Sequence, residues 1–210
     1  TDFGTEIQAA FTDEAKDSGL TYAVETTHKP DEADFTGPLQ KLHESGCNLV
    51  GLGLGIKHTI TVLGTAKKLG YNDMKFLGSS ASFHTAIAKV PGGITEGFYA
   101  AAGWQDLEAR AGDPEVAAWI KSYVEATGEQ FPGTGALLGR SAAEQFVRGL
   151  EAAGPDLTHA SFQKGMESLD YEDKIAGNHV KMGPGDHLAA DAVYISKIEG
   201  GSWKTLAGTM

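Results

Sequence analysis

Hydrophobic residues recur at helical spacing from the first positions of the chain. Ile7, Phe11 and Ala15 fall on one face, which predicts an amphipathic helix over residues 3–18. Gly19 follows this face and supplies the expected helix end. The sequence therefore starts with a helix rather than with a strand.

Short apolar runs alternate with helical segments over the first half of the sequence. The predicted helices cover residues 3–18, 38–44 and 59–69, with a short one beginning near residue 83, and the predicted strands cover 21–25, 47–55, 75–78 and 97–104. Residues 47–55, CNLVGLGLG, are typical of a strand buried on both faces. This alternation is typical of a parallel sheet with helices on both sides, so the expected fold class is α/β.

The pattern changes after Trp104, where helices follow one another without a long strand between them. Helices are predicted over residues 114–127, 136–152 and 159–168, and strand character returns at 178–183 and in a hairpin turned by Gly200 and Gly201. We therefore expect two lobes. Residues 1–103 and 185–210 form one of them, and residues 104–184, which are largely helical, belong to the other.

A parallel sheet that starts with a helix has a gap at the position of its first strand. In the flavodoxin-like strand order 2-1-3-4-5, the first strand lies between the second and the third. Its absence would leave two rows of backbone groups unpaired, and each buried unpaired group costs about 1–3 kcal/mol. Because a whole domain is stable by only about 5–15 kcal/mol, we expect a complementary N-terminal segment to supply this strand.

Composition and charge exclude several classes of function. The 210 residues are 41% hydrophobic and 21% charged, which is typical of a globular chain. The formal net charge is −11 and the longest basic run is Lys67-Lys68, so nucleic acids and anionic membrane surfaces are not expected as partners. No apolar run approaches the roughly 20 residues that span a bilayer, and no stretch resembles a signal peptide. Cys47 is the one cysteine, so no internal disulfide is possible.

Motifs associated with catalysis or cofactors are incomplete. After Gly51 and Gly53, the third glycine of a G-x-G-x-x-G dinucleotide loop is replaced by Ile56. The seven histidines, His179 among them, lack paired helical spacing, and GRSAA lacks the second glycine of a G-x-S-x-G nucleophile elbow. The sequence therefore predicts no catalytic residue, no cofactor and no metal site.

An ordered series of segments resembles the later part of one family of binding proteins. The segments are DFGTEIQAAF, DFTGPLQKLHESGCNLVGLGLG, AKKLGYNDMKFLGSSAS, GGITEGFYAAAGW, DPEVAAWIKSYVEATGEQFPGTGALLGRSAAEQF and MGPGDHLAADAVYISKIEGGSWKTL. In this order they are similar to type I periplasmic substrate-binding proteins of ABC importers, in particular the branched-chain amino acid (Leu/Ile/Val) receptors. The resemblance covers essentially the whole chain. It implies two flavodoxin-like lobes with parallel sheets, here lacking the N-terminal portion, and a place in the periplasm or at the extracellular face of the cell envelope.

The same resemblance assigns ligand contacts to positions of this sequence. Phe3 stands where the family places an aromatic contact at the first helix of the second lobe, and Gly55 and Ile56 stand at a second contact. Phe3 equally fits a hydrophobic staple under its helix, and Gly53 and Gly55 fit turn residues. Two further contact positions are occupied by Trp104 and Gly135, although a tryptophan at this place also fits packing between lobes.

The segment GSSAS departs from the amino-acid-binding members of the family. Ser79, Ser80 and Ala81 follow the predicted strand 75–78, and Ser80 stands where those members place an acidic residue that pairs with the α-ammonium of the ligand. A serine hydroxyl supplies no negative charge for a buried ammonium. We therefore expect a ligand without a strongly held ammonium: a carboxylic acid, an amide or urea-like molecule, or an aromatic acid. Ser79 and Ser80 also fit a cap of the helix that begins near residue 83.

Three functions are compatible with this sequence. The resemblance favours a solute receptor that captures a small ligand between two lobes and delivers it to the permease subunits of an ABC importer. The second function is the ligand-sensing domain of a regulator or receptor, which a fused effector segment would favour. The third is an α/β enzyme that uses the same cleft. Since no catalytic constellation is found, we expect a binding protein rather than an enzyme.

Overall fold

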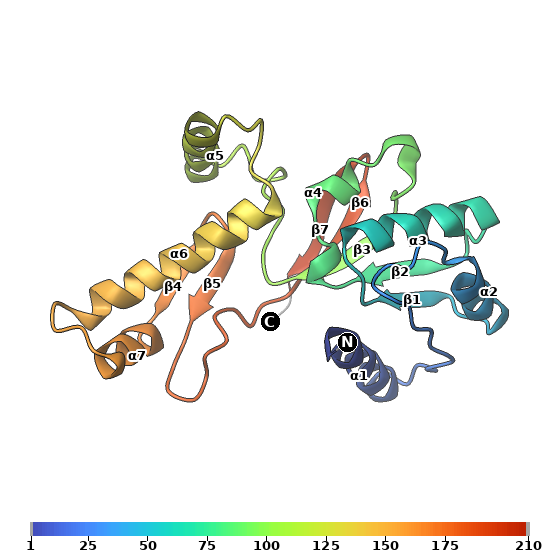
Figure 1. Ribbon diagram of the computed structural model, residues 1–210, viewed down its shortest axis with the longest axis horizontal. Helices are drawn as coiled ribbons and strands as arrows, with labels where there is room; N and C mark the ends of the chain where they lie inside the picture. The colour runs from blue at the N-terminus through green and yellow to red at the C-terminus, as the bar shows by residue number, and fades with distance from the viewer. Residues whose placement is uncertain (1, 209–210) are drawn as a thin grey trace. The chain divides into compact units, whose positions relative to one another are not determined.

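The computed structural model describes residues 2–208 and separates the chain into two compact units (Figure 1). Within the described residues, the first unit is formed by residues 2–102 together with Ile195–Leu206, and the second by Gly103–Tyr194 with residues 207–208. Among the described residues, the first unit contains a five-stranded sheet, and the second contains a two-stranded sheet beside its helices.

The sheet of the first unit contains parallel strands, as the sequence predicts. Its strands are β1 (Leu49–Leu52), β2 (Lys75–Gly78), β3 (Tyr99–Ala102), β6 (Tyr194–Glu199) and β7 (Ser202–Gly208), in the spatial order β1-β2-β3-β6-β7. β1 pairs in parallel with β2, and β2 with β3, which confirms the α/β fold class. Gly200 and Gly201 join β6 to β7 with φ of 61° and 74°, the positive values that a type I′ hairpin turn requires.

In the described chain, four helices belong to the first unit, and a glycine follows each of the first three. They are α1 (Asp2–Asp17), α2 (Thr36–Glu44), α3 (Ile56–Leu69) and α4 (Thr85–Ala88), with the 3₁₀ turns η1 (Ser80–Ser82) and η2 (Pro91–Gly93). Gly19, Gly46 and Gly70 follow the first three helices with positive φ, the left-handed conformation that ends a helix at low cost in a glycine. α3 begins three residues before the predicted Thr59, because the backbone of Gly55 takes the extended N-cap conformation.

One face of the sheet supplies the core of the first unit. Its buried residues occupy alternate positions along the strands and include Val50, Leu52, Phe76, Ala100 and Ile198. α3 adds Val62, Leu63 and Ala66 from its buried side. Burial of these side chains is the main favourable contribution to folding of the unit.

The opposite face of the sheet is only partly covered, so the prediction that β1 is buried on both faces is wrong. Leu49 is 48% exposed, and Gly51 is exposed as well. α1 lies over this face at β1, because a Cβ at Gly51 would come within 2.3 Å of the ring of Phe11. α1 nevertheless buries none of its own residues. The apolar run marks a strand with one buried face and one half-open face.

The strand predicted over residues 21–25 does not form. These residues belong to no helix or strand of the described chain, and Tyr22 is 39% exposed. Side chains hold the segment: the Tyr22 hydroxyl donates to the Glu25 carboxylate at 3.1 Å, and Lys41 Nζ donates to the Glu25 carbonyl oxygen at 3.1 Å. β1 is the end strand of the described sheet, so the flavodoxin-like neighbour that would pair with residues 21–25 is not among the described strands.

The second unit is built from three helices and a hairpin among the described residues. These elements are α5 (Pro114–Thr127), α6 (Thr134–Ala153), α7 (His159–Glu167), β4 (Asp170–Asp173) and β5 (Asn178–Lys181). Asp113 accepts backbone N–H bonds at the start of α5, and Thr158 forms a capping box with Ser161 at the start of α7. β4 pairs antiparallel with β5. The sequence pattern did not predict this strand, because its residues, DYED, are mostly acidic. None of the described helices combines the length and the apolar character needed to cross a membrane.

A buried carboxylate fastens α6 to the β4–β5 turn within the second unit. Asp173 is 2% exposed, and its Oδ1 atom accepts a hydrogen bond from Arg140 Nη1 at 2.6 Å. The same oxygen accepts from the N–H groups of Ile175 and Ala176 at 3.0 Å. Ser141 donates to the second oxygen at 2.6 Å. Removing the carboxylate would leave all of these donors without their acceptor.

We predict that Asp173→Ala destabilises the chain by about 3–5 kcal/mol, the usual cost of removing one partner from a buried ion pair. Urea unfolding followed by circular dichroism measures the change. The matched control is Glu125→Ala, because the Glu125 carboxylate pairs with Lys121 on the exposed surface of α5. This variant should lose less than about 1 kcal/mol. Equal losses in the two variants would contradict the role assigned to Asp173.

Candidate ligand-binding site

Two loops of the first unit begin side by side at the carboxyl ends of neighbouring parallel strands. Leu52, the last residue of β1, is paired with Gly78, the last residue of β2. Ligands of open α/β sheets bind outside this edge of the sheet. The loops that follow lead into α3 and η1, and they carry five of the eight predicted contact residues: Gly55, Ile56, Ser79, Ser80 and Ala81.

A buried hydroxyl pair ties the two loops together. Ser82 Oγ donates to the carbonyl oxygen of Leu54 at 2.7 Å, and it shares a hydrogen bond with Thr59 Oγ1 at 2.9 Å. Ser82 and Thr59 are fully buried. Bonds of this kind fix the loop after β1 against the loop after β2, so the backbone groups at this edge keep a defined position. Sequence reasoning missed both residues, because each is one of several polar residues in its segment, SSASFH for Ser82 and IKHTIT for Thr59.

The local structure does not require a glycine at position 55, which is one of the predicted ligand contacts. Gly55 has φ −82° and ψ 179°, which any residue adopts, and a Cβ there would meet nothing within 4 Å. Neither backbone strain nor crowding therefore requires a glycine at this position. Gly78 behaves differently, because its Cβ would come within 2.7 Å of Phe98 and Ser82.

The hydroxyl group of Ser79 is a buried polar group that makes no hydrogen bond within the described chain. Its Oγ atom is buried and finds no hydrogen-bond partner among the described residues. Ser80 and Ala81 are exposed in η1. A buried hydroxyl without a partner carries an energetic cost, which a ligand that bonds to it would remove.

The prediction that Ser79 and Ser80 cap the next helix is wrong. His84 is the N-cap of α4, and its Nδ1 atom accepts the N–H bond of Ala86 at 3.0 Å. Burial lowers the pKa of His84 below its usual value, which keeps the ring neutral and Nδ1 free to accept. Because the folded pKa is depressed, this contribution to stability is present above about pH 6.5 and is lost as the pH falls. The serines are therefore not needed as caps.

The electrostatic character of the two loops favours an anion over a cation. Residues 53–59 (GLGIKHT) and 79–84 (SSASFH) contain no aspartate or glutamate and include Lys57. The first loop also ends at the N-terminus of the 14-residue α3, where free backbone N–H groups and the helix dipole favour negative charge. A buried ammonium would find no carboxylate on these loops.

Phe3 lies in the first turn of α1 and is 40% exposed. It does not anchor the helix to the sheet; Phe11 does so at Gly51, and Ile7 lies 3.5 Å from a Cβ placed at Gly53. The side chain of Phe3 is thus available at the surface of the first unit. Its role as a ligand contact stays a prediction.

Trp104 and Gly135 belong to the second unit. Trp104 is half-buried and packs against the core cluster formed by Leu107, Val116, Leu137, Ile175 and Ala176. Gly135 is exposed in the first turn of α6, and a Cβ there would meet nothing within 4 Å. Packing accounts for the position of Trp104, whereas Gly135 has no structural constraint. Both remain predictions as ligand contacts.

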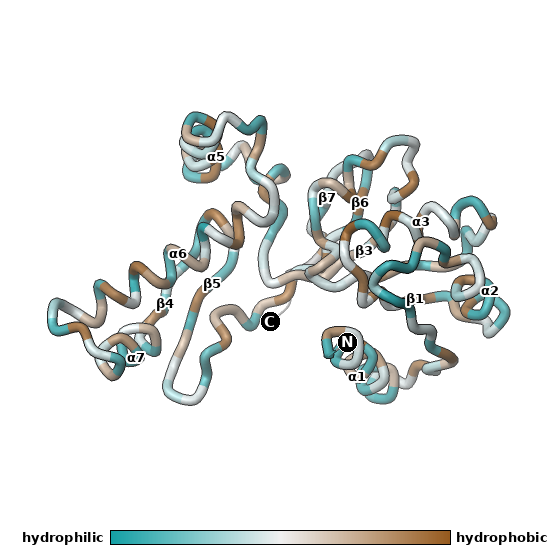
Figure 2. The backbone as a smooth tube through the Cα atoms, viewed as in Figure 1, coloured by the Kyte–Doolittle hydropathy of each residue, from teal (hydrophilic) through white to brown (hydrophobic). Residues whose placement is uncertain are grey.

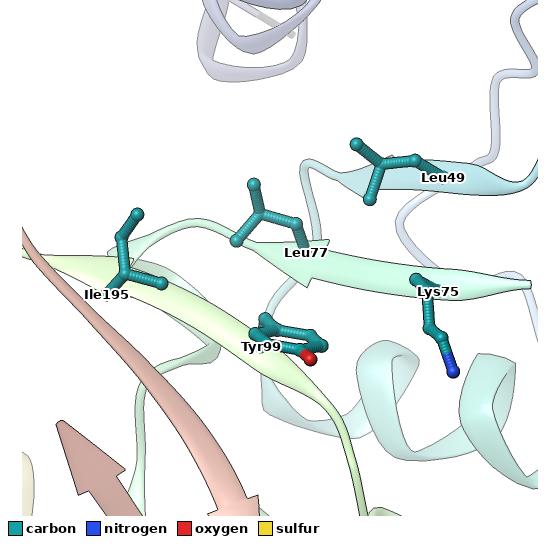
Figure 3. A pocket seen from close by; sticks show the side chains of 5 residues that line it. All are labelled: Leu49, Lys75, Leu77, Tyr99 and Ile195. Carbon is teal, nitrogen blue, oxygen red and sulfur yellow. The ribbon is translucent and has the colours of Figure 1, made fainter. Parts of the chain in front are cut away.

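The half-open sheet face of the first unit contains a separate hollow of about 250 Å³. Figure 3 shows its lining, one or two side chains from each of four strands: Leu49, Lys75, Leu77, Tyr99 and Ile195. These residues lie along the strands, not on the loops at their carboxyl ends. None of the predicted contact residues lines the hollow. We interpret the hollow as uncovered surface of the sheet.

The sequence profile of a family described as periplasmic binding protein matches residues 1–202. The chain belongs to the periplasmic binding protein family. This confirms the resemblance drawn from the ordered segments. Because ligands of open α/β sheets bind outside the carboxyl ends of the strands, the loops after β1 and β2 are the candidate for part of a ligand site. Among the described residues, no group of three or more metal-ligating side chains is placed to hold a metal ion.

Solved periplasmic binding proteins share this fold. They include a leucine-binding protein from Thermotoga maritima (TM-score 0.79, 15% identity, 99% of this chain and 57% of that one). A fatty acid ABC transporter substrate-binding protein from Thermomonospora curvata reaches a TM-score of 0.82 at 21% identity, with coverage of 98% and 54%. A solute-binding protein from R. palustris in complex with 4-hydroxybenzoate reaches 0.80 at 14% identity, with coverage of 98% and 57%. The chain thus spans little more than half the length of these proteins. No curated protein matches it in sequence.

We predict that Ser82→Ala lowers the free energy of unfolding by about 1–3 kcal/mol, because the Leu54 carbonyl and the Thr59 hydroxyl lose a buried partner. Urea unfolding measures the effect. Ser122→Ala, at an exposed position of α5, serves as the control and should stay within about 0.5 kcal/mol of the parent chain. An unchanged unfolding midpoint for Ser82→Ala would show that the two loops are held by other contacts.

Proposed function

We propose that this chain forms part of a solute receptor that captures a small carboxylate-bearing ligand and delivers it to the permease subunits of an ABC importer. The receptor works in the periplasm or at the extracellular face of the cell envelope. The observation that carries the choice of ligand is the pair of acid-free loops with the buried, unpartnered hydroxyl of Ser79. Membership of the periplasmic binding protein family supports the receptor role.

A carboxylate suits the donors that these loops offer. Ser79 Oγ can donate one hydrogen bond, and the first N–H groups of α3 provide further donors with the favourable end of the helix dipole. Ser80 is uncharged, so an α-ammonium group would be desolvated beside it without a counter-charge. The proposed ligands are therefore carboxylic acids, including aromatic acids, and after them amides or urea-like molecules.

The chemistry of solved relatives agrees with this choice. One relative is named as a fatty acid substrate-binding protein and another was solved with 4-hydroxybenzoate, and both ligands are acids without an ammonium group. A third relative is named as a leucine-binding protein, whose ligand carries both groups. The fold therefore accommodates either class, and the residue at position 80 is proposed to decide between them.

The receptor is proposed to contain a complementary segment that pairs with the free edge of β1. β1 pairs with β2 on one side and ends the described sheet on the other. Residues 21–25 have strand-like alternation but no backbone partner in the described chain. One added strand between them would satisfy both, in the order 2-1-3-4-5 of flavodoxin-like sheets.

Calorimetric titration of the gene product that contains these residues tests the ligand class. We expect benzoate, 4-hydroxybenzoate or octanoate to bind with a Kd in the micromolar range or below, and leucine and valine to bind at least 100-fold more weakly. Ser80→Glu should weaken binding of the acid at least tenfold, because a like charge is placed beside it. The same variant should strengthen binding of leucine.

Ser122→Glu adds the same charge on the exposed surface of α5 and controls for the change in net charge. It should leave both affinities unchanged. Micromolar binding of leucine or valine by the unaltered protein would contradict the proposed ligand class. Failure of every ligand of either class to bind would contradict the receptor function itself.

A further inference from the structure

His84 links α4 to the loop that follows β2, and three hydrogen bonds hold it in place. Its backbone N–H donates to the carbonyl oxygen of Ser82 at 3.1 Å, and its own carbonyl oxygen accepts from Trp203 Nε1 at 3.1 Å. Its ring Nδ1 accepts from the backbone N–H of Ala86 at 3.0 Å. Trp203 is 1% exposed, so its bond fixes the backbone of His84 to the core of the first unit. One residue thus joins α4 to the serine that ties the two candidate loops together.

The bond from Ala86 requires an uncharged ring at His84. A backbone N–H can only donate, so Nδ1 must carry a lone pair, and an imidazolium has none because both of its nitrogens carry protons. Protonation would place two N–H donors against each other across 3.0 Å. The ring would then have to turn away, and the first N–H groups of α4 would lose their cap. Acid therefore removes the cap at this position.

The surroundings of the His84 ring keep it uncharged near neutral pH. α4 consists mostly of hydrophobic residues, TAIA (Figure 2), and burial lowers the pKa of His84. η1 carries no charged residue, and the charged or titratable side chains of the other neighbouring elements are Lys89 after α4, Lys204 on β7, Tyr99 on β3, and Lys57, His58, Lys67 and Lys68 on α3. Burial is the one cause of the shift. Within the described chain, no carboxylate therefore stabilises the charged ring.

His84 also ends a series of backbone hydrogen bonds that begins at Ser79. The N–H of Ser82 donates to the carbonyl oxygen of Ser79 at 2.9 Å, and the N–H of Phe83 donates to that of Ser80 at 3.2 Å. These bonds close the turn η1, which follows the buried hydroxyl of Ser79 and includes the predicted contact Ser80. Phe83 lies between the turn and His84 and is 3% exposed. A shift of His84 is therefore transmitted to the turn over a short, buried path.

We propose that His84 is a positioning residue of the candidate ligand site: its uncharged ring holds loop 79–84 in the form that binds the ligand, and protonation of the ring releases the loop. The inference rests on the proposed function for the ligand and adds a pH control to it. Because the folded pKa of His84 lies below its usual value of about 6.5, affinity should be constant above that pH and should fall below it, by at most about tenfold per pH unit for one proton. A direct contact between an imidazolium and a carboxylate would have the opposite sign. The direction of the pH dependence therefore distinguishes a cap from a contact.

Calorimetric titration with 4-hydroxybenzoate, at about pH 7.5 and about pH 5, tests this role in the gene product that contains these residues. The parent should bind at least about threefold more weakly at the lower pH. The asparagine of His84→Asn caps helices but does not titrate, so its two affinities should differ less, and the remaining difference measures ionisation of the ligand and of other groups. His84→Ala lacks a cap and should bind more weakly than His84→Asn at the higher pH. His159→Asn, at an exposed position of α7, is the matched control and should keep the parent's ratio of affinities.

A measurement without ligand separates this inference from the proposed function. In NMR spectra of the ligand-free gene product, the amide signals of Ser80, Ser82 and Ala86 should shift with one midpoint, that of the His84 ring, and His84→Asn should abolish these shifts. This measurement tests the coupling of ring and loop even if the receptor function fails.

Three results would overturn the proposal. The first is an equal pH dependence of affinity in the parent and in His84→Asn. The second is tighter binding by the parent at the lower pH, because the charged ring would then act as a ligand contact. The third is a ring titration that the amides of Ser80 and Ser82 do not follow, which the parent alone reveals if a variant fails to fold.

Discussion

The edge of β1 that has no partner strand among the described residues is the constraint on which the arrangement of the first unit depends. A strand inside a parallel sheet bonds on both sides, and β1 bonds to β2 on one side only within the described chain. α1 lies over the same strand through Phe11 and Gly51, and residues 21–25 lie outside any strand. The proposed complementary strand would account for these features, because it would complete the sheet and give residues 21–25 a partner.

The position of the candidate site is set by the parallel pairing of β1 with β2. Parallel pairing places the ends of β1 and β2 at one edge, and Ser82 then fastens the two loops that leave that edge. Rigid loops keep their donors in place before a ligand arrives, which lowers the ordering cost of binding. Both loops lack acidic side chains, so under the proposed function a buried ammonium would have no counter-charge there. The proposed ligand class would thus follow from a few side chains placed on a common fold.

Elements determined by local chemistry were predictable from the sequence. α5 and α7 follow from the caps Asp113 and Thr158, and the β6–β7 hairpin follows from Gly200 and Gly201, since these residues act on their immediate neighbours. Elements that depend on a distant partner were not predictable. β4 has an acidic sequence and exists through its pairing with β5, whereas residues 21–25 have the right alternation and form no strand.

The candidate site, too, could be predicted only in part from the sequence. Its loops could be located because they follow predicted strands. The tie through Ser82 and Thr59 could not, because it joins residues 23 positions apart. The cap at His84 was also missed, since histidine is not among the preferred N-cap residues.

Amide hydrogen exchange at β1 tests the central claim most directly. In the 210-residue chain, the β1 amides that do not bond to β2 should exchange like unprotected amides, whereas those bonded to β2 should be protected. In the gene product that contains these residues, both sets and the amides of residues 21–25 should be protected at least 100-fold. Free exchange of the same amides in the gene product would contradict the account, because the edge of β1 would then have no partner strand.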